Sequence, residues 1–220
     1  MRTATIQIIP KATAKAIHGG LTQTSKMPCK SYSLPTAACQ TGFKMAQIPG
    51  SICSACYANK GFYSLYAKTI EPAQHARLDS LSDPHWVAAM VSSIGADRYF
   101  RWHDSGDLQS LEHLELITAV CELTPNCQHW LPTREYGIAK AYVAKHGRIP
   151  ANLVIRLSAM YPDKPVAIPA SLRNVPGITA SNVHTIKPIG QACHAPDQAG
   201  ECRDCRACWD RQTVISYSMH

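Results

Sequence analysis

The sequence lacks a long apolar run and has few charged residues for its length. No stretch approaches the roughly 20 apolar residues that a membrane-spanning helix requires. Its start contains no apolar core followed by a small-residue cleavage site. These absences predict a cytoplasmic protein with no membrane partner. There is also no internal repeat and no low-complexity segment, and charged residues make up only 17% of the chain. That composition excludes a disordered or fibrous protein.

What is present favours a globular domain with an anionic partner. Hydrophobic residues make up 45% of the 220 residues, so the chain can bury a sizeable core without crosslinks. We expect one domain over residues 1–220. The formal net charge of +7 favours nucleic acid, nucleotides or phosphorylated metabolites as partners, although no long run of lysine and arginine occurs.

The middle of the chain alternates between strand-like and helix-like segments. We expect helices at 71–81, 82–95, 110–124 and 136–147, strands at 98–104, 129–135 and 152–160, and short strands at 5–9, 177–184 and 213–218. Such alternation predicts parallel βαβ units in an α/β fold over about 71–190. The units are too few for a complete eight-fold barrel. A partial or distorted barrel or an open sheet is expected, flanked by irregular cysteine-rich, metal-binding regions at 21–66 and 191–210.

Ten cysteines are several times the usual share, and in a reducing cytoplasm they indicate metal or redox chemistry. The C-terminal set has the spacing C-x8-C-x2-C-x2-C and comprises Cys193, Cys202, Cys205 and Cys208. Three thiolates from one short loop and one from a distance match the way a 4Fe-4S cluster is held. Zinc is the alternative, although tetrahedral zinc usually takes paired knuckles from separate segments.

The N-terminal set has the spacing C-x9-C-x13-C-x2-C and comprises Cys29, Cys39, Cys53 and Cys56. Zinc and a second iron–sulfur cluster are equally compatible with this spacing. A further alternative is that only Cys53 and Cys56 share a site with the C-terminal set. Cys121 lies on the apolar stripe of a predicted helix and is expected to be a buried structural thiol. Cys127, in the loop that follows, has no evident partner.

A row of charged residues stands where the predicted parallel strands end. The row comprises Arg101, His103, Asp104, Asp107, Arg134, Glu135 and Arg156. Ligands of α/β sheets bind outside the carboxyl ends of the strands. The arginines are expected either to clamp a phosphate or carboxylate or to pair with the acids in an internal ion network. The acids and His103 are candidates for binding Mg²⁺ or Mn²⁺ or for acid–base catalysis. Asp107 is equally a candidate for a helix N-cap.

Aromatic residues follow the C-x2-C motif and are interleaved with Lys60 and Lys68. They are Tyr57, Phe62, Tyr63 and Tyr66. Bases stack on such side chains in proteins that bind single-stranded nucleic acid. The alternative is that these aromatics only wrap a thin-cored cysteine region.

Five strings in the chain resemble the phage and plasmid "gene product 88" family. They are SKMPCKSYSLP, GSICSACYANKG, YFRWHDSGDLQSLEHL, WLPTREYGI and CRDCRACW. The resemblance runs from about residue 24 to the C-terminus and implies a phage-type protein in a bacterial host, without a settled activity. The strand-end pattern is also similar in style to radical-SAM-like barrels, but the C-x3-C-x2-C motif of those enzymes is absent.

Three functions remain open from the sequence. The leading hypothesis is an iron–sulfur protein that acts on nucleic acid, as a nuclease if the strand-end acids hold a divalent metal. The second is a radical or redox enzyme whose cluster is catalytic. The third is a non-enzymatic regulatory or DNA-binding protein with purely structural metal sites.

Overall fold

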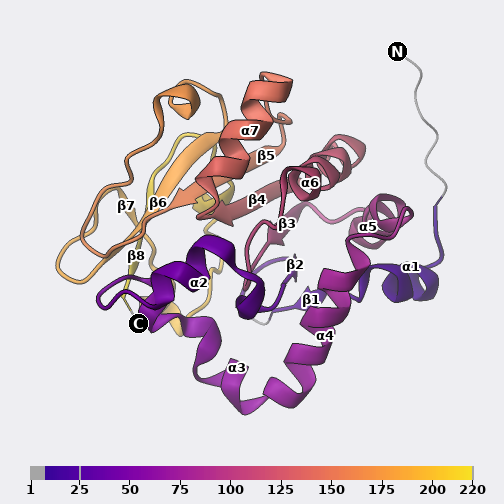
Figure 1. The fold of residues 1–220 in the computed structure, drawn as a ribbon, viewed down its shortest axis with the longest axis horizontal. Helices are drawn as coiled ribbons and strands as arrows, with labels where there is room; N and C mark the ends of the chain where they lie inside the picture. The colour runs from indigo at the N-terminus through magenta and orange to yellow at the C-terminus, as the bar shows by residue number, and fades with distance from the viewer. Residues whose placement is uncertain (1–7, 25, 220) are drawn as a thin grey trace.

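The computed structural model describes residues 8–24 and 26–219, which form a mixed α/β fold (Figure 1). One eight-stranded sheet has the order β1-β2-β3-β4-β5-β6-β8-β7. Only β1 and β2 pair antiparallel, and every other pair is parallel. The strands are β1 (Thr22–Gln23), β2 (Lys30–Tyr32), β3 (Tyr99–Trp102), β4 (Gln128–Thr133), β5 (Leu153–Ser158), β6 (Ile178–His184), β7 (Gln191–Ala192) and β8 (Ile215–Ser218). The expected parallel sheet is therefore confirmed, and within the described residues it is open.

Seven α-helices accompany the sheet in the described residues. They are α1 (Lys11–His18), α2 (Gln40–Ala46), α3 (Phe62–Leu65), α4 (Ala67–Ser80), α5 (Trp86–Ile94), α6 (Leu111–Leu123) and α7 (Tyr136–His146). None of the helices in this part of the chain is long and apolar enough to cross a membrane.

The strand order explains why the helices gather on one face of the sheet. From β2 to β6 each strand lies beside the one before it in the sequence. Right-handed crossovers that all step in one direction place their helices on the same side. Phe100 and Trp102 of β3 and Leu131 of β4 accordingly point into the main core with the helices. The same core takes Ile155 and Leu157 of β5.

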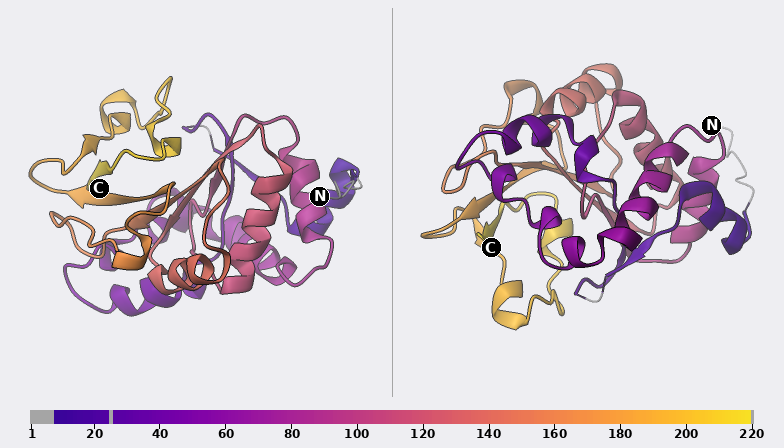
Figure 2. Two further views of the ribbon diagram at one scale, coloured as in Figure 1. Left: turned by 90° about the horizontal axis from the view of Figure 1, so that it is seen from above. Right: turned by 60° about the horizontal axis from the view of Figure 1, so that its bottom comes forward.

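The opposite face of the sheet is covered by the C-terminal segment 191–213. Trp209 lies 5% exposed against Trp130 and Val154 in a second, smaller apolar cluster. Figure 2 shows this yellow segment on the side of the sheet away from α6 and α7. Arg156 belongs to this face as well, because it follows Val154 by two residues in β5.

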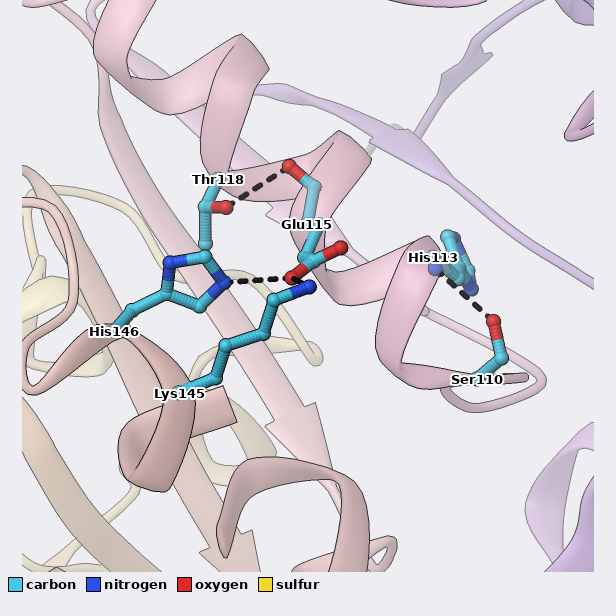
Figure 3. Close-up of polar contacts among 6 residues, drawn as sticks. All are labelled: Ser110, His113, Glu115, Thr118, Lys145 and His146. Carbon is cyan, nitrogen blue, oxygen red and sulfur yellow. Dashed lines mark hydrogen bonds and ion pairs between the residues drawn. The ribbon is translucent and has the colours of Figure 1, made fainter. Parts of the chain in front are cut away.

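The ends of α6 and α7 follow the capping chemistry of the sequence. Ser110 is the N-cap of α6, and its hydroxyl accepts a hydrogen bond from the amide of His113. Gly147 ends α7 in the left-handed conformation. The two helices are joined at their surface by Glu115, which contacts Lys145 at 2.7 Å and His146 at 2.6 Å (Figure 3).

Several local expectations differ from the structure. The segment before residue 20 contains α1, and most of the strand expected at 5–9 lies outside the described residues. Helix α4 begins at Ala67 instead of at residue 71, with Pro72 inside it. The 21–66 region is not irregular throughout, because it includes β1, β2, α2 and α3. Ser110 is the N-cap of α6, so the expectation that Asp107 caps a helix is wrong for α6. The single domain expected over 1–220 stays a prediction.

Candidate functional site: two cysteine groups on the sheet

Three cysteines, Cys39, Cys53 and Cys56, meet beyond the carboxyl end of β2, and we call them the edge group. Cys39 precedes α2, while Cys53 and Cys56 begin and follow a short 3-10 turn. A methyl group placed on Gly42 of α2 would lie 3.6 Å from the sulfur of Cys39 and 3.8 Å from that of Cys53. The two sulfur atoms therefore share one small space, which a glycine at position 42 leaves free.

Burial favours the protonated form of two edge-group thiols, those of Cys39 and Cys53. Burial raises the pKa of Cys39 to about 12, and the nearby Asp107, Cys56 and Cys53 add to that effect. Burial also raises the pKa of Cys53. Arg134 is the cation that opposes the shift at both cysteines, so its guanidinium faces the group. A thiolate here would require the positive charge of a metal in addition to that of Arg134.

Two of the predicted site acids make hydrogen bonds at the end of β4, beside the edge group. Asp107 accepts hydrogen bonds from the hydroxyl of Thr133 at 2.6 Å and from the amide of Arg134 at 2.8 Å. Glu135 accepts from the amide and hydroxyl of Thr41 at 2.7 and 2.8 Å. Thr41 is in the first turn of α2, where a carboxylate is favourable. Glu135 therefore ties α2, and with it Cys39, to the end of β4, whereas Asp107 holds the loop after β3 to the same strand end.

Cys29 is not part of the edge group, although the sequence spacing grouped it there. It precedes β2, whereas Cys39 follows that strand, so the two lie toward opposite edges of the sheet. Cys29 is 6% exposed and packs with Trp130 and Trp209. Burial raises its pKa to about 12, Arg101 lowers it, and the Cys202 thiol raises it again.

The C-terminal cysteines lie over the same face of the sheet as Cys29. We call Cys29, Cys193, Cys202, Cys205 and Cys208 the face group. The thiols interact with one another: Cys193 with Cys205, Cys202 with Cys193 and Cys205, and Cys208 with Cys193. Burial raises the pKa of Cys208 to about 11, and its sulfur lies 3.3 Å from the hydroxyl of Tyr217.

No metal-ligand set is already assembled in the part of the chain that the structure describes. There, no three His, Cys, Asp or Glu side chains form a group that could hold a metal ion. The metal-binding character that the spacing predicts for both cysteine-rich regions is therefore not supported by this arrangement. What the structure does provide is proximity of thiols in two places. Cys121, the expected structural thiol, is fully buried, and Cys127 is 1% exposed.

Arg156 anchors the segment that carries the face group. It is fully buried. Its five N–H donors all go to backbone carbonyls, namely those of Ala180, Ala207, Cys208, Asp210 and Thr213. Neither a ligand nor a carboxylate takes any of them, so Arg156 has neither of the two uses that the sequence suggested. It acts as a positioning residue for residues 207–213.

Arg101 lies between the two cysteine groups. Its guanidinium stacks 4.5 Å from the ring centre of Trp130 and donates to the sulfur of Met27 and, at 3.4 Å, to the hydroxyl of Tyr57. Tyr57 in turn donates to the backbone carbonyl of Asp104. The Asp104 carboxylate accepts from Tyr63 at 3.2 Å, and its other oxygen is buried without a partner among the described residues. Arg101 and Asp104 thus belong to one connected polar group.

His103 is buried at the end of β3 in a strained conformation, with φ at 50°. Neither ring nitrogen has a hydrogen-bond partner in the described chain, and the ring of His113 lies 5.3 Å away. Burial lowers the pKa of His103 well below its usual value, so the imidazole is neutral. A neutral imidazole with free nitrogens can accept a hydrogen bond from a ligand that enters beside it.

The predicted site residues therefore separate into distinct roles. Arg134 faces the edge group, Arg101 and Asp104 form the polar link, and His103 is buried next to them. The sequence did not single out Gly42 or Thr41, although a glycine within a helical stretch is a signal of close approach. Two surface hollows along α7 lie away from all these residues.

A family model described as "Gene product 88" matches residues 6–211 of the chain. No curated protein matches the chain. No solved structure matches it either. Because the match covers nearly the whole chain, this protein belongs to the gene product 88 family, a phage-type gene product family.

Proposed function

We propose that this member of the gene product 88 family is an iron–sulfur enzyme of the redox or radical class that acts on nucleic acid. Its reactive centre would be held by Cys39, Cys53 and Cys56. The observation that carries the proposal is that these three thiols gather at the carboxyl edge of a parallel sheet while Cys29 lies elsewhere. Such an edge is where α/β folds bind their ligands.

The number of thiols supports a catalytic role over a structural one. A 4Fe-4S cluster has four irons, and four cysteines close it. Three thiolates would leave one iron able to bind a substrate or cofactor, just as catalytic zinc sites keep an open position. When bound, such a cluster would supply one-electron chemistry. The alternative metal, zinc, would supply a Lewis acid at the same three thiols.

The chain's own residues would prepare this centre in three ways. Arg134 would balance the negative charge of the thiolates and could donate to a carboxylate at the open position. Glu135 would keep α2 on the end of β4. Gly42 would leave room for the metal between two sulfur atoms.

Nucleic acid is the substrate class that the surrounding surface favours. The segment 40–68 exposes Phe43 and Tyr57, by 58% and 51% respectively. Lys44, Lys60 and Lys68 are exposed along the same segment, and the chain carries a net charge of +7. Aromatic faces beside cations bind single strands by stacking and by charge. The side chain of Phe62 lies outside the described residues.

The test uses protein prepared without oxygen and reduced with dithionite. A paramagnetic iron–sulfur signal that shifts when S-adenosylmethionine is added, together with release of 5′-deoxyadenosine, is the result expected for the radical version. A reduced cluster that transfers electrons without S-adenosylmethionine would indicate the redox version. A protein that binds no iron and cannot be reduced would contradict both.

Hydrolysis of nucleic acid is the second candidate function. Its support is the positive charge and the exposed aromatics, with Mg²⁺ or Mn²⁺ held by strand-end acids. The contacts of Asp107 and Glu135 favour it less, because both carboxylates already hold backbone and hydroxyl groups. Single- and double-stranded DNA and RNA incubated with and without either metal would test it. Absence of cleavage in every arm would rule it out.

A further inference from the structure

Three cysteines of the C-terminal loop follow one another at intervals of three residues, and a turn of the backbone joins the first two. The amide of Cys205 donates to the carbonyl of Cys202 at 2.9 Å, which closes a turn through Arg203 and Asp204. A turn closed in this way keeps its first and last α-carbons within roughly 7 Å of each other. A disulfide joins residues whose α-carbons are about 4.4–6.8 Å apart. The backbone therefore brings Cys202 and Cys205 within reach of a disulfide.

The turn between these two cysteines is strained and is held on both sides. Arg203 has φ at 44°, a conformation that residues other than glycine rarely adopt and that is found preferentially at functional sites. The guanidinium of Arg206 donates to the carbonyls of Arg203 at 2.5 Å and Cys205 at 2.8 Å. The amide of Cys202 donates to the carbonyl of Lys26 at 2.9 Å. The turn is therefore a fixed feature of the loop that keeps the two cysteines together.

The third cysteine of the loop, Cys208, has different surroundings. Its sulfur lies 3.3 Å from the hydroxyl of Tyr217, and its carbonyl accepts a hydrogen bond from the buried Arg156 at 3.0 Å. Cys205, by contrast, is exposed, and Cys202 is half-buried beside it. Neither of these two sulfur atoms has a hydrogen-bond partner among the described residues. A reagent in solution therefore reaches Cys205 first, and Cys202 is the thiol next to it.

We propose that Cys202 and Cys205 are a reversible dithiol–disulfide pair, a modification site that reacts with small-molecule disulfides of the glutathione class. The thiolate of Cys205 attacks one sulfur of the small disulfide, forms a mixed disulfide and releases the first small thiol. The thiolate of Cys202 then attacks the sulfur of Cys205 and releases the second. The protein loses two electrons and two protons, and the small disulfide is reduced to two thiols.

The charges around the pair assist this exchange, which requires a thiolate. Burial raises the pKa of the Cys202 thiol, and the positive charges of Arg101 and Arg206 oppose that shift. The reaction needs only two thiols, so it requires no metal-ligand set. It is also independent of the centre proposed at the edge group, which uses other cysteines.

The experiment treats the reduced full-length protein with oxidised glutathione, alkylates the remaining thiols and identifies linked peptides by mass spectrometry. Trypsin cuts after Arg203 and Arg206, so it separates the three cysteines of the loop into the peptides 174–203, 204–206 and 207–211. Peptide 174–203 also contains Cys193, so the variant Cys193→Ser is treated in parallel. We expect 174–203 to be joined to 204–206 in both proteins, and the link to disappear when dithiothreitol is added.

Single substitutions separate the roles of the two thiols, and circular dichroism checks that each variant is folded. Cys202→Ser removes the second thiol and should accumulate glutathione on Cys205. Cys205→Ser should leave most of Cys202 unmodified. Cys208→Ser is the matched control and should form the link as the unsubstituted protein does.

Three results would overturn the proposal. They are a peptide 204–206 that stays unlinked in the folded protein, a link from 204–206 to 207–211, and loss of the link in Cys193→Ser. The iron content of the edge-group variants is measured separately, so failure of the proposed iron–sulfur function and failure of this pair are distinguishable.

Discussion

Cys39 and Cys53 place their sulfur atoms against the same point of α2, within 4 Å of where a side chain on Gly42 would begin. Thirteen residues separate the two cysteines, so their meeting is a product of the fold. The contact depends on α2 being held by Glu135 and on Gly42 having no side chain. It is the structural basis of the reactive centre that we propose.

Gly42→Ala should reduce metal binding at the edge group by at least half. The added methyl group would lie 3.0 Å from the β-carbon of Cys39 and would fill the space between the two sulfur atoms. Gly137→Ala is the matched control, because that glycine is also within a helix and has nothing within 4 Å of the added methyl group. Both changes favour the helix by roughly 0.5–1 kcal/mol. Equal iron and sulfide contents in the two variants would argue against the edge centre.

Arg156→Met should destabilise the protein by at least about 3 kcal/mol, because it removes the five hydrogen bonds that the buried guanidinium donates to backbone carbonyls. Urea unfolding measures the change. Arg173→Met is the control, since Arg173 is exposed and donates to the carbonyl of Ile168 alone. A loss below 1 kcal/mol for Arg156→Met would show that the C-terminal segment does not depend on this anchor.

The protein should become less stable as the pH falls from 6.5 toward 4. Burial lowers the pKa of His113 and of His129 to about 3 and that of His18 to about 4. In the unfolded chain these histidines bind protons near pH 6.5. Between the folded-state pKa values and pH 6.5 the unfolded state binds more protons than the folded state. The free energy of unfolding is therefore highest above pH 6.5 and decreases as the pH falls below it. Each histidine contributes up to about 1.4 kcal/mol per pH unit.

Urea unfolding at several pH values tests this dependence. His129→Gln should reduce the slope of the free energy of unfolding against pH, because about one proton fewer is bound on unfolding. A stability that is flat between pH 4 and 6.5 in the unsubstituted protein would contradict the buried, neutral state of these histidines.

Phe43→Ala should weaken binding of single-stranded DNA by about 1–3 kcal/mol if the aromatic ring stacks on a base. Lys44→Gln should lower the slope of log affinity against log salt by about 0.7. Ile186→Ala serves as control, since Ile186 is 85% exposed and lies outside the 40–68 segment. Fluorescence anisotropy with a labelled oligonucleotide measures all three. If neither Phe43→Ala nor Lys44→Gln changes the affinity for the oligonucleotide, the segment 40–68 does not bind single-stranded DNA.

The parallel core was predictable because its signals are local. The apolar segments of α6 and α7 lie where the sequence places them, and Gly147 ends α7 as expected, although Ser110 and not Asp107 is the N-cap of α6. Strand β2 was missed, although Tyr32 and Leu34 alternate with Ser31 and Ser33, which is a strand period. That single omission grouped Cys29 with Cys39, because no strand was known to separate them.

The roles of the charged residues could not be predicted from their spacing. The sequence placed Arg156 and Glu135 at strand ends but contained no sign of their partners. The partners are backbone carbonyls of 207–213 and the first turn of α2, which the fold brings from distant parts of the chain. Arg156, which donates to five backbone carbonyls, and Arg134, which faces thiols, cannot be told apart from the sequence alone.

The most direct test of the edge centre is the iron and acid-labile sulfide content of anaerobically prepared protein. The account predicts that Cys39→Ser, Cys53→Ser and Cys56→Ser each lose about four irons per chain, together with absorbance near ~400 nm. Cys121→Ser, which removes a thiol from the main core, should lose none. Edge-group variants that stay folded and hold as much iron and sulfide as the unsubstituted protein would contradict the account.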